Sequence, residues 1–179
     1  MHSSDGLTAA RRDAYSGGVT GLTVGWDHDV ELLLDFLNTR HVLDSEASWR
    51  AWVTERGLGR SSEITQARAA RAALRSSIEG SSGPQTAAGV VHIELTDGVP
   101  VLSSSDALGA VLAASARLAV LGSWERFKIC PADDCQRAFF DRSRNRSRTW
   151  CSMQVCGNRE KARTFRKRTR AQNSTLATV

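Results

Sequence analysis

The sequence predicts an α+β fold, with a mainly helical N-terminal domain that carries a short β-hairpin. A small C-terminal four-cysteine module follows it, expected to be a β-hairpin followed by a basic helix. Three observations predict this: apolar residues recur at helical spacing in four segments, a favoured hairpin dipeptide separates two short apolar runs, and all cysteines lie between residues 130 and 156. We expect a flexible leader over residues 1–26, a helical domain over 27–122, the cysteine module over 124–170 and a flexible tail over 171–179.

Helices are expected at four places in the N-terminal domain, over residues 30–42, 48–56, 62–79 and 106–121. The first segment is short enough that a buried strand remains an alternative. A glycine follows each of the other three segments, and Ser105 is the expected N-cap of the last. Between the last two helices, residues 81–89 indicate a loop, and VVHIELTDGVPVL indicates a hairpin that turns at Asp97-Gly98.

The charge is concentrated at one end of the chain. The net charge is +5, but residues 124–170 carry 14 Lys or Arg against 5 Asp or Glu, whereas the remaining residues carry 10 against 14. Codon usage could explain why 21 of the cations are Arg and 3 are Lys, but it does not explain their location. A basic end on a near-neutral to acidic body favours contact with a polyanion.

Apolar segments are too short for a membrane protein. The longest charge-free stretch in the most apolar region covers residues 107–116, well below the roughly 20 residues that span a bilayer. The first residues, MHSSDGLTAARRDAYSGG, contain no apolar run that could serve as the core of a signal peptide. We therefore expect a cytoplasmic protein that does not contact membranes.

The four cysteines are spaced Cys130-x4-Cys135-x15-Cys151-x4-Cys156. Two close pairs separated by a longer connection are typical of a structural zinc site, because each pair supplies two ligands from one tight turn. Disulfides are disfavoured in a reducing cytoplasm, and an iron–sulfur cluster usually has other spacings. A catalytic zinc ion keeps an open position and usually has histidine or carboxylate ligands, which this segment does not offer. We expect one structural zinc ion.

Around the cysteines, RFKICP and AFFD predict a strand-turn-strand, and the second pair leads into a helix from about residue 158 to 170 that Asn158 can cap. The apolar content of this module is small, which suits a fold that depends on a metal. The core candidates are Phe127, Ile129, Phe139, Phe140, Trp150 and Val155.

Arginines lie between and after the cysteine pairs. Arg142, Arg144, Arg146 and Arg148 alternate with small polar residues, so an extended loop would project them to one side. In the following helix only Ala162 and Phe165 suit inward packing, and its cations are Arg159, Lys161, Arg163, Arg166, Lys167, Arg168 and Arg170. Arginine binds phosphate through two parallel hydrogen bonds, so we expect these cations to bind nucleic acid. A solvated basic helix and an acidic protein partner are the alternatives.

A second candidate site lies in the N-terminal domain. Asp35, Asn38, Thr39 and His41 fall within seven residues of a partly apolar segment, where buried polar groups could bind a small molecule. Alternatively, Asp35 or Asn38 caps neighbouring backbone groups and His41 is a surface residue. The sequence shows no nucleophile–base pair, phosphate-binding glycine loop or paired carboxylates, and we therefore expect no catalytic residues and no enzyme.

CSMQVCGNREKAR closely resembles the signature of the CGNR zinc-finger family, and the likeness extends back through FFDRSRNRSRTWC. Upstream, LLLDFLNTRH is similar to the opening motif of the ABATE domain, which usually precedes this finger, although the stretch over residues 79–97 looks short for that domain. The resemblance implies a bacterial two-domain protein with zinc on the four cysteines, described as a stress-induced transcription regulator whose finger binds DNA.

The family therefore favours DNA over RNA as the partner. A basic helix could enter a DNA major groove, whereas Trp150 or Phe140 could stack on an unpaired RNA base. The N-terminal domain is then expected to sense a ligand or to form a homodimer.

Overall fold

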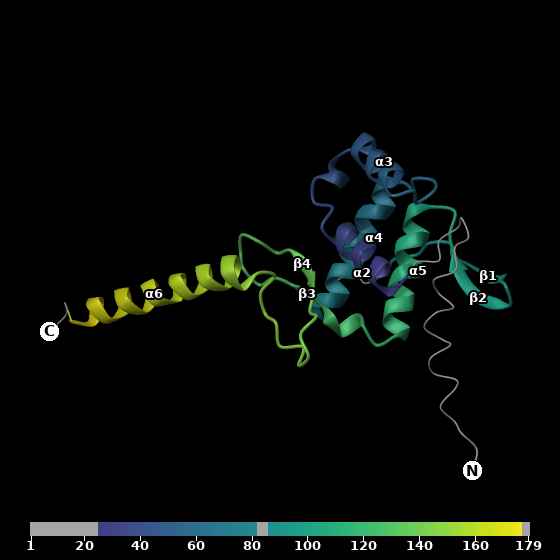
Figure 1. The fold of residues 1–179 in the computed structure, drawn as a ribbon. Helices are drawn as coiled ribbons and strands as arrows, with labels where there is room; N and C mark the ends of the chain where they lie inside the picture. The colour runs from purple at the N-terminus through teal and green to yellow at the C-terminus, as the bar shows by residue number, and fades with distance from the viewer. Residues whose placement is uncertain (1–24, 82–85, 177–179) are drawn as a thin grey trace, which may run out of the picture. The chain divides into compact units, whose positions relative to one another are not determined.

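The computed structural model describes residues 25–81 and 86–176, and the side chains of residues 171–176 are not described (Figure 1). Most of the expected leader, part of the loop over residues 81–89 and the last three residues lie outside the described residues. The chain divides into two compact units, Met1–Glu125 and Arg126–Val179. Together they have the predicted α+β composition, with the cysteines in the second unit.

The first unit contains the predicted helices and the predicted hairpin. Its elements are α2 (Trp26–Leu37), the 3-10 turn η1 (Val42–Asp44), α3 (Glu46–Glu55), α4 (Ile64–Glu79), β1 (His92–Thr96), β2 (Val99–Ser103) and α5 (Ala107–Val120). The short turn η2 (Trp124–Arg126) leads out of this unit. The first apolar segment is thus a helix rather than a strand, and it begins and ends earlier than expected.

The core of the first unit is built on α2 and α5, which pack together. Leu33 and Phe36 of α2 are fully buried, and the Trp49 ring on α3 lies 6.1 Å from the Phe36 ring. A buried ion pair joins the two central helices, because Arg117 of α5 donates to both carboxylate oxygens of Asp29, at 2.6 and 2.8 Å. The sequence did not predict this pair.

The N-cap of α5 differs from the expectation. Asp106, not Ser105, caps the helix, because the Asp106 carboxylate accepts from the Gly109 amide at 2.9 Å. The Ser105 carbonyl instead accepts from the Arg60 amide at 3.0 Å. Serine and aspartate are both good N-caps, so the sequence alone does not show at which of the two residues the helix begins.

The hairpin of the first unit pairs β1 with β2 in an antiparallel register that sets Thr96 opposite Val99. Asp97 and Gly98, the predicted turn residues, both have positive φ, at 51° and 78°. Such angles at both turn positions suit the right-handed twist of a two-residue hairpin, which explains why this dipeptide marks the turn.

The second unit is small. It contains β3 (Phe127–Ile129), β4 (Ala138–Phe140), the π-helical turn η3 (Met153–Gly157) and α6 (Asn158–Leu176). β3 and β4 form the expected strand-turn-strand, with Phe127 opposite Phe140 and Ile129 opposite Ala138. In the part of the chain that the structure describes, no helix has the length and apolar content to cross a bilayer.

Two local expectations for the second unit are wrong. The helical turn before α6 is capped by Ser152, whose hydroxyl accepts from the Val155 amide, and Asn158 has helical backbone angles instead of capping. Val155 is 60% exposed and does not belong to the core. The extent of α6 also exceeds the expectation, because the helix continues past residue 170 to Leu176.

Candidate metal centre and basic surface

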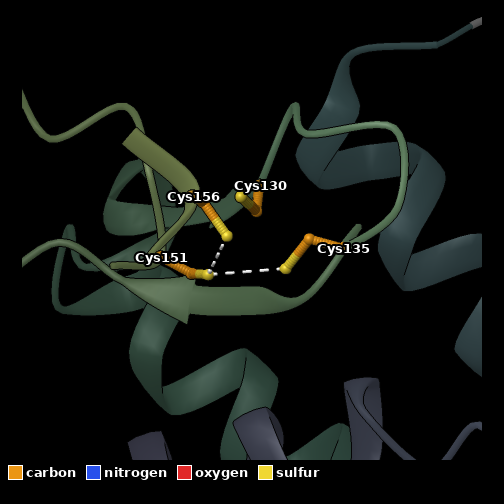
Figure 2. A group of neighbouring side chains, drawn as sticks. All are labelled: Cys130, Cys135, Cys151 and Cys156. Atoms are coloured by element: carbon orange, nitrogen blue, oxygen red, sulfur yellow. Dashed lines mark hydrogen bonds between the residues drawn. The ribbon is translucent and has the colours of Figure 1, made fainter. Parts of the chain in front are cut away.

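The four cysteines converge on one point (Figure 2). Their sulfur atoms all lie within 4.8 Å of one another, with Cys135 Sγ 3.5 Å from Cys151 Sγ and Cys151 Sγ 3.6 Å from Cys156 Sγ. Sulfurs at tetrahedral corners 2.3 Å from a zinc ion would be about 3.8 Å apart, whereas a disulfide requires about 2.05 Å. The sulfurs are therefore positioned to hold one metal ion.

The hairpin supplies the first two sulfurs. Cys130 follows β3 directly, and its amide donates to the Arg137 carbonyl, which extends the strand pairing to the first ligand. The chain then turns back, because the Cys135 amide donates to the Ala132 carbonyl at 2.9 Å. Gln136 has a positive φ of 50° and completes this turn. A turn of this kind brings two cysteines five residues apart to the same metal.

The turn η3 supplies the other two sulfurs. Cys151 precedes the capping residue Ser152, and Cys156 lies within the turn. Gly157 packs so closely that a Cβ atom there would lie 2.4 Å from the Met153 sulfur and 3.1 Å from Cδ1 of Trp150. Glycine is therefore favoured at this position by close packing, not by a positive φ.

A small apolar cluster surrounds the sulfurs. Cys130, Ala132, Phe139 and Cys156 are buried together, and Trp150 packs against them. Burial favours the neutral thiol of Cys130, yet hydrogen bonds from the amides of Cys151 and Ala132 lower its pKa below the ordinary value.

The pKa values of the second pair of thiols shift in the opposite direction. Burial and the neighbouring thiols raise the pKa of Cys151, and burial likewise raises the pKa of Cys156. Crowded thiols cannot all ionise without a compensating cation, and a soft divalent ion supplies that charge. The donor set and its spacing therefore fit a metal such as zinc.

Asp141 forms a buried polar centre beside the cysteines. Its side chain is 0% exposed, and its carboxylate accepts from Lys128 Nζ at 2.7 Å and from the amides of Ser143 and Arg148 at 2.9 and 2.8 Å. Lys128 Nζ also donates to the Arg146 and Arg148 carbonyls. This network holds the segment between the cysteine pairs, which is a turn, with Arg146 at a φ of 50°, and not an extended strand.

Sequence reasoning missed this network. Lys128 was one of many cations, and Asp141 was one acid in a basic stretch, so neither stood out. Arg126 belongs to the same arrangement, because its guanidinium donates to the carbonyls of Asp141 and Ser143. The available signal was a single acid placed directly after the apolar strand AFF, where a carboxylate can become buried.

The predicted nucleic-acid-binding residues divide into two groups. One group has contacts inside the module. Arg148 donates to the carbonyls of Trp150 and Cys151 and lies 5.2 Å from the Phe139 ring, while Arg159 and Arg163 pair with acids near the first cysteine pair. Side chains of this group support the cysteine turns.

The other group faces solvent. Arg142, Arg144 and Arg146 are exposed, and all ten residues of α6 from 161 to 170 are exposed as well. Phe165, one of two residues expected to pack inward, is 71% exposed, and Ala162 is exposed too. This part of α6 therefore has no buried face within its own unit. Its cations are Lys161, Arg166, Lys167, Arg168 and Arg170, together with Arg163, which is exposed but pairs with Asp133 and Glu160.

The four candidate ligand residues of the first unit have separate local partners. Asp35 pairs with Arg56 at 2.8 Å, and the Thr39 hydroxyl donates to the Phe36 carbonyl at 2.6 Å. Asn38 is the C-cap of α2, and His41 is an exposed residue 3.4 Å from Asp44. A cleft of about 490 Å³ in this unit is lined by other residues: Arg60, Ser61, Ser62, Gln66, Ala88, Gly89, Val90, Asp106 and Leu108.

Comparison with known proteins identifies the second unit. No curated protein shows significant similarity to the chain. The family model of the CGNR zinc finger matches residues 126–169, which include all four cysteines, the Asp141 network and α6 up to residue 169. The likeness of LLLDFLNTRH to the ABATE domain stays a prediction. Residues 126–169 are thus similar to the CGNR zinc finger.

Proposed function

We propose that the four cysteines bind one structural zinc ion and that the module so ordered binds nucleic acid, DNA in preference to RNA, as part of a transcription regulator. The role is binding and not catalysis. The observation that carries the proposal is the long exposed stretch of α6, which is strongly basic and has no buried residue between positions 161 and 170.

The cations of α6 are available to a polyanion. Arg166, Lys167, Arg168 and Arg170 take part in no ion pair within the described residues. At 3.6 residues per turn, Arg166, Lys167 and Arg170 share one side of the helix. Cations on one side of an exposed helix can contact successive phosphates along a groove, and such contacts dominate nucleic-acid affinity.

Burial of the aromatic residues supports DNA over single-stranded RNA. Phe140 is buried and pairs edge-on with Phe127 at 4.9 Å, and Trp150 packs against the cysteine cluster. Phe140 is therefore not free to stack on an unpaired base, and Trp150 is only partly exposed for such a contact. Phe165 on α6 is the exposed aromatic residue of the module, and it provides a direct test of the RNA alternative.

The salt dependence of binding tests the proposal. Zinc-loaded protein is titrated with duplex DNA at several salt concentrations, for wild type and for R166A, K167A and R170A. A variant that no longer neutralises one phosphate should flatten the plot of log K against log salt by about 0.9. Arg50, an exposed cation on α3, provides the control, and R50A should leave the slope unchanged.

Selection from random pools of duplex DNA and single-stranded RNA identifies the partner. Enrichment from the DNA pool is the expected result. Enrichment from the RNA pool alone, abolished in F165A, would replace DNA by RNA. Failure to enrich either pool would overturn nucleic-acid binding and favour an acidic protein partner.

A further inference from the structure

We propose that Arg159 belongs to the metal centre, where its guanidinium donates to the Cys156 sulfur and compensates the negative charge of the metal-bound thiolates. It is then not a phosphate contact, although its position in the basic helix suggested one. This inference rests on the zinc-binding half of the proposed function and not on nucleic-acid binding.

The contacts of Arg159 join the two cysteine pairs. Its Nη2 atom lies 3.6 Å from Cys156 Sγ and 2.8 Å from Oδ1 of Asp134, the residue before Cys135. The same guanidinium thus reaches a ligand of the second pair and the turn that carries the first. Arg148 and Arg126 donate to backbone carbonyls, and Arg163 pairs with carboxylates, whereas Arg159 contacts a cysteine sulfur.

Arg159 is held close to the cysteines. Its Nε atom is buried and has no hydrogen-bond partner within the described part of the chain. Part of the Arg159 side chain is therefore shielded from solvent. A buried donor without a partner costs free energy, and the placement is explained if the guanidinium serves a strongly negative neighbour. A zinc ion with four thiolates carries a net charge of about −2.

Charge compensation by Arg159 has a clear physical effect. A hydrogen bond from a cation to a thiolate lowers the energy of the sulfur lone pairs and favours the metal-bound, deprotonated state. Arg159 should therefore strengthen zinc binding and make Cys156 a weaker nucleophile. Groups that contact metal ligands in this way commonly change metal affinity by about 10- to 100-fold.

α6 itself provides a matched control. Arg159, Arg163 and Arg166 lie on one side of the helix, at spacings of four and three residues. Arg163 pairs with Asp133 and Glu160, whereas Arg166 is exposed and forms no ion pair in the described residues. R159M and R166M remove the same charge from the same side of the same helix, but only R159M removes a hydrogen bond to sulfur.

Zinc affinity provides the first measurement, by chelator competition on the full chain at one fixed pH and without nucleic acid. R159M should weaken zinc binding at least about tenfold, R159K should weaken it less, and R166M should match wild type. Equal zinc affinity in R159M and wild type would overturn the proposal.

Cobalt substitution and thiol alkylation separate charge compensation from mere bracing of the two turns. In R159M the sulfur-to-cobalt charge-transfer band should move to lower energy, and iodoacetamide should modify the metal-loaded cysteines faster. If zinc affinity falls while band and alkylation rate remain those of wild type, Arg159 only braces the turns and the proposal is wrong. If R159M does not fold with zinc, the cobalt band and the alkylation rate are measured in R159K instead. Lysine keeps the charge but loses the forked hydrogen bonds, so both signals should change in the same direction as expected for R159M. Wild-type values for both signals in R159K would then contradict the proposal.

The result is independent of the nucleic-acid half of the proposed function. A protein that binds zinc through an Arg159-dependent centre but binds no nucleic acid would disprove the partner and confirm the inference. A protein that binds nucleic acid with unchanged zinc affinity in R159M would do the opposite.

Discussion

At the scale of single residues, the second unit depends on charges placed inside it. Burial disfavours ionisation of Asp141, but the Lys128 ammonium and the donors of Ser143 and Arg148 hold its pKa far below the usual range. Lys128 uses its remaining donors on the carbonyls of Arg146 and Arg148. One ion pair therefore fixes the shape of the segment between the cysteine pairs.

Breaking this pair should destabilise the module strongly. D141N leaves Lys128 without its counterion in a largely enclosed site, and removing one partner of such a pair costs about 3 kcal/mol of unfolding free energy. Thermal unfolding of the zinc-loaded chain measures this loss, and K128M/D141N should recover part of it. Additive losses in the double variant would contradict the pairing.

The pH dependence of stability follows from the direction in which the pKa of Asp141 is shifted. Because the folded pKa lies below the unfolded value, the carboxylate contributes fully above the ordinary aspartate pKa of about 4. Its contribution disappears only as the pH falls further. Between pH 8 and 6 the difference in unfolding free energy between wild type and D141N should therefore stay constant.

At the scale of elements, local sequence signals predicted most of the fold. Apolar periodicity located α4 and α5, and Asp97-Gly98 located the turn of β1 and β2, because both signals act over a few neighbouring residues. The cysteine spacing likewise predicted the metal-binding cluster. Contacts between distant residues, such as Asp29 with Arg117, leave no local signal and were missed.

The arginines of α6 show the same limit at the candidate site. Sequence reasoning could identify the cations but could not tell those with contacts inside the module from those exposed to solvent. Arg159 and Arg166 have the same chemistry and differ only in their neighbours. The turn η3 also escaped prediction, and Gly157 at its end is closely packed against Met153 and Trp150.

A larger residue at Gly157 should destabilise the turn η3. In G157A the added methyl group would contact the Met153 sulfur and Trp150, and overpacking of this kind costs about 1–2 kcal/mol of unfolding free energy. Met153 is half-exposed and can move, whereas Trp150 is packed against the cysteine cluster. Thermal unfolding of zinc-loaded G157A and G157A/M153A should show a loss that the second change partly reverses. No loss in G157A would contradict the packing.

At the scale of the whole molecule, the two units differ in what holds them together. The first has an apolar core built on α2 and α5, with Leu33, Phe36 and Trp49 fully buried. The second has a short two-stranded hairpin, a small cluster around the sulfurs and a long exposed helix. We expect a unit with so little apolar burial to depend on a metal ion, because zinc binding would supply free energy that the core does not.

Removing the metal should therefore unfold one unit and spare the other. After chelation, amide hydrogen exchange should show reduced protection in β3, β4 and η3, while α2 and α5 keep theirs. Nucleic-acid binding should disappear together with the protection of the second unit, since the cations of α6 are then no longer fixed beside the cysteine turns. Zinc added back, but not magnesium, should restore both signals, because thiolates select the softer ion. Loss of protection in α2 and α5 at the same chelator concentration would show instead that the first unit cannot fold without the metal centre.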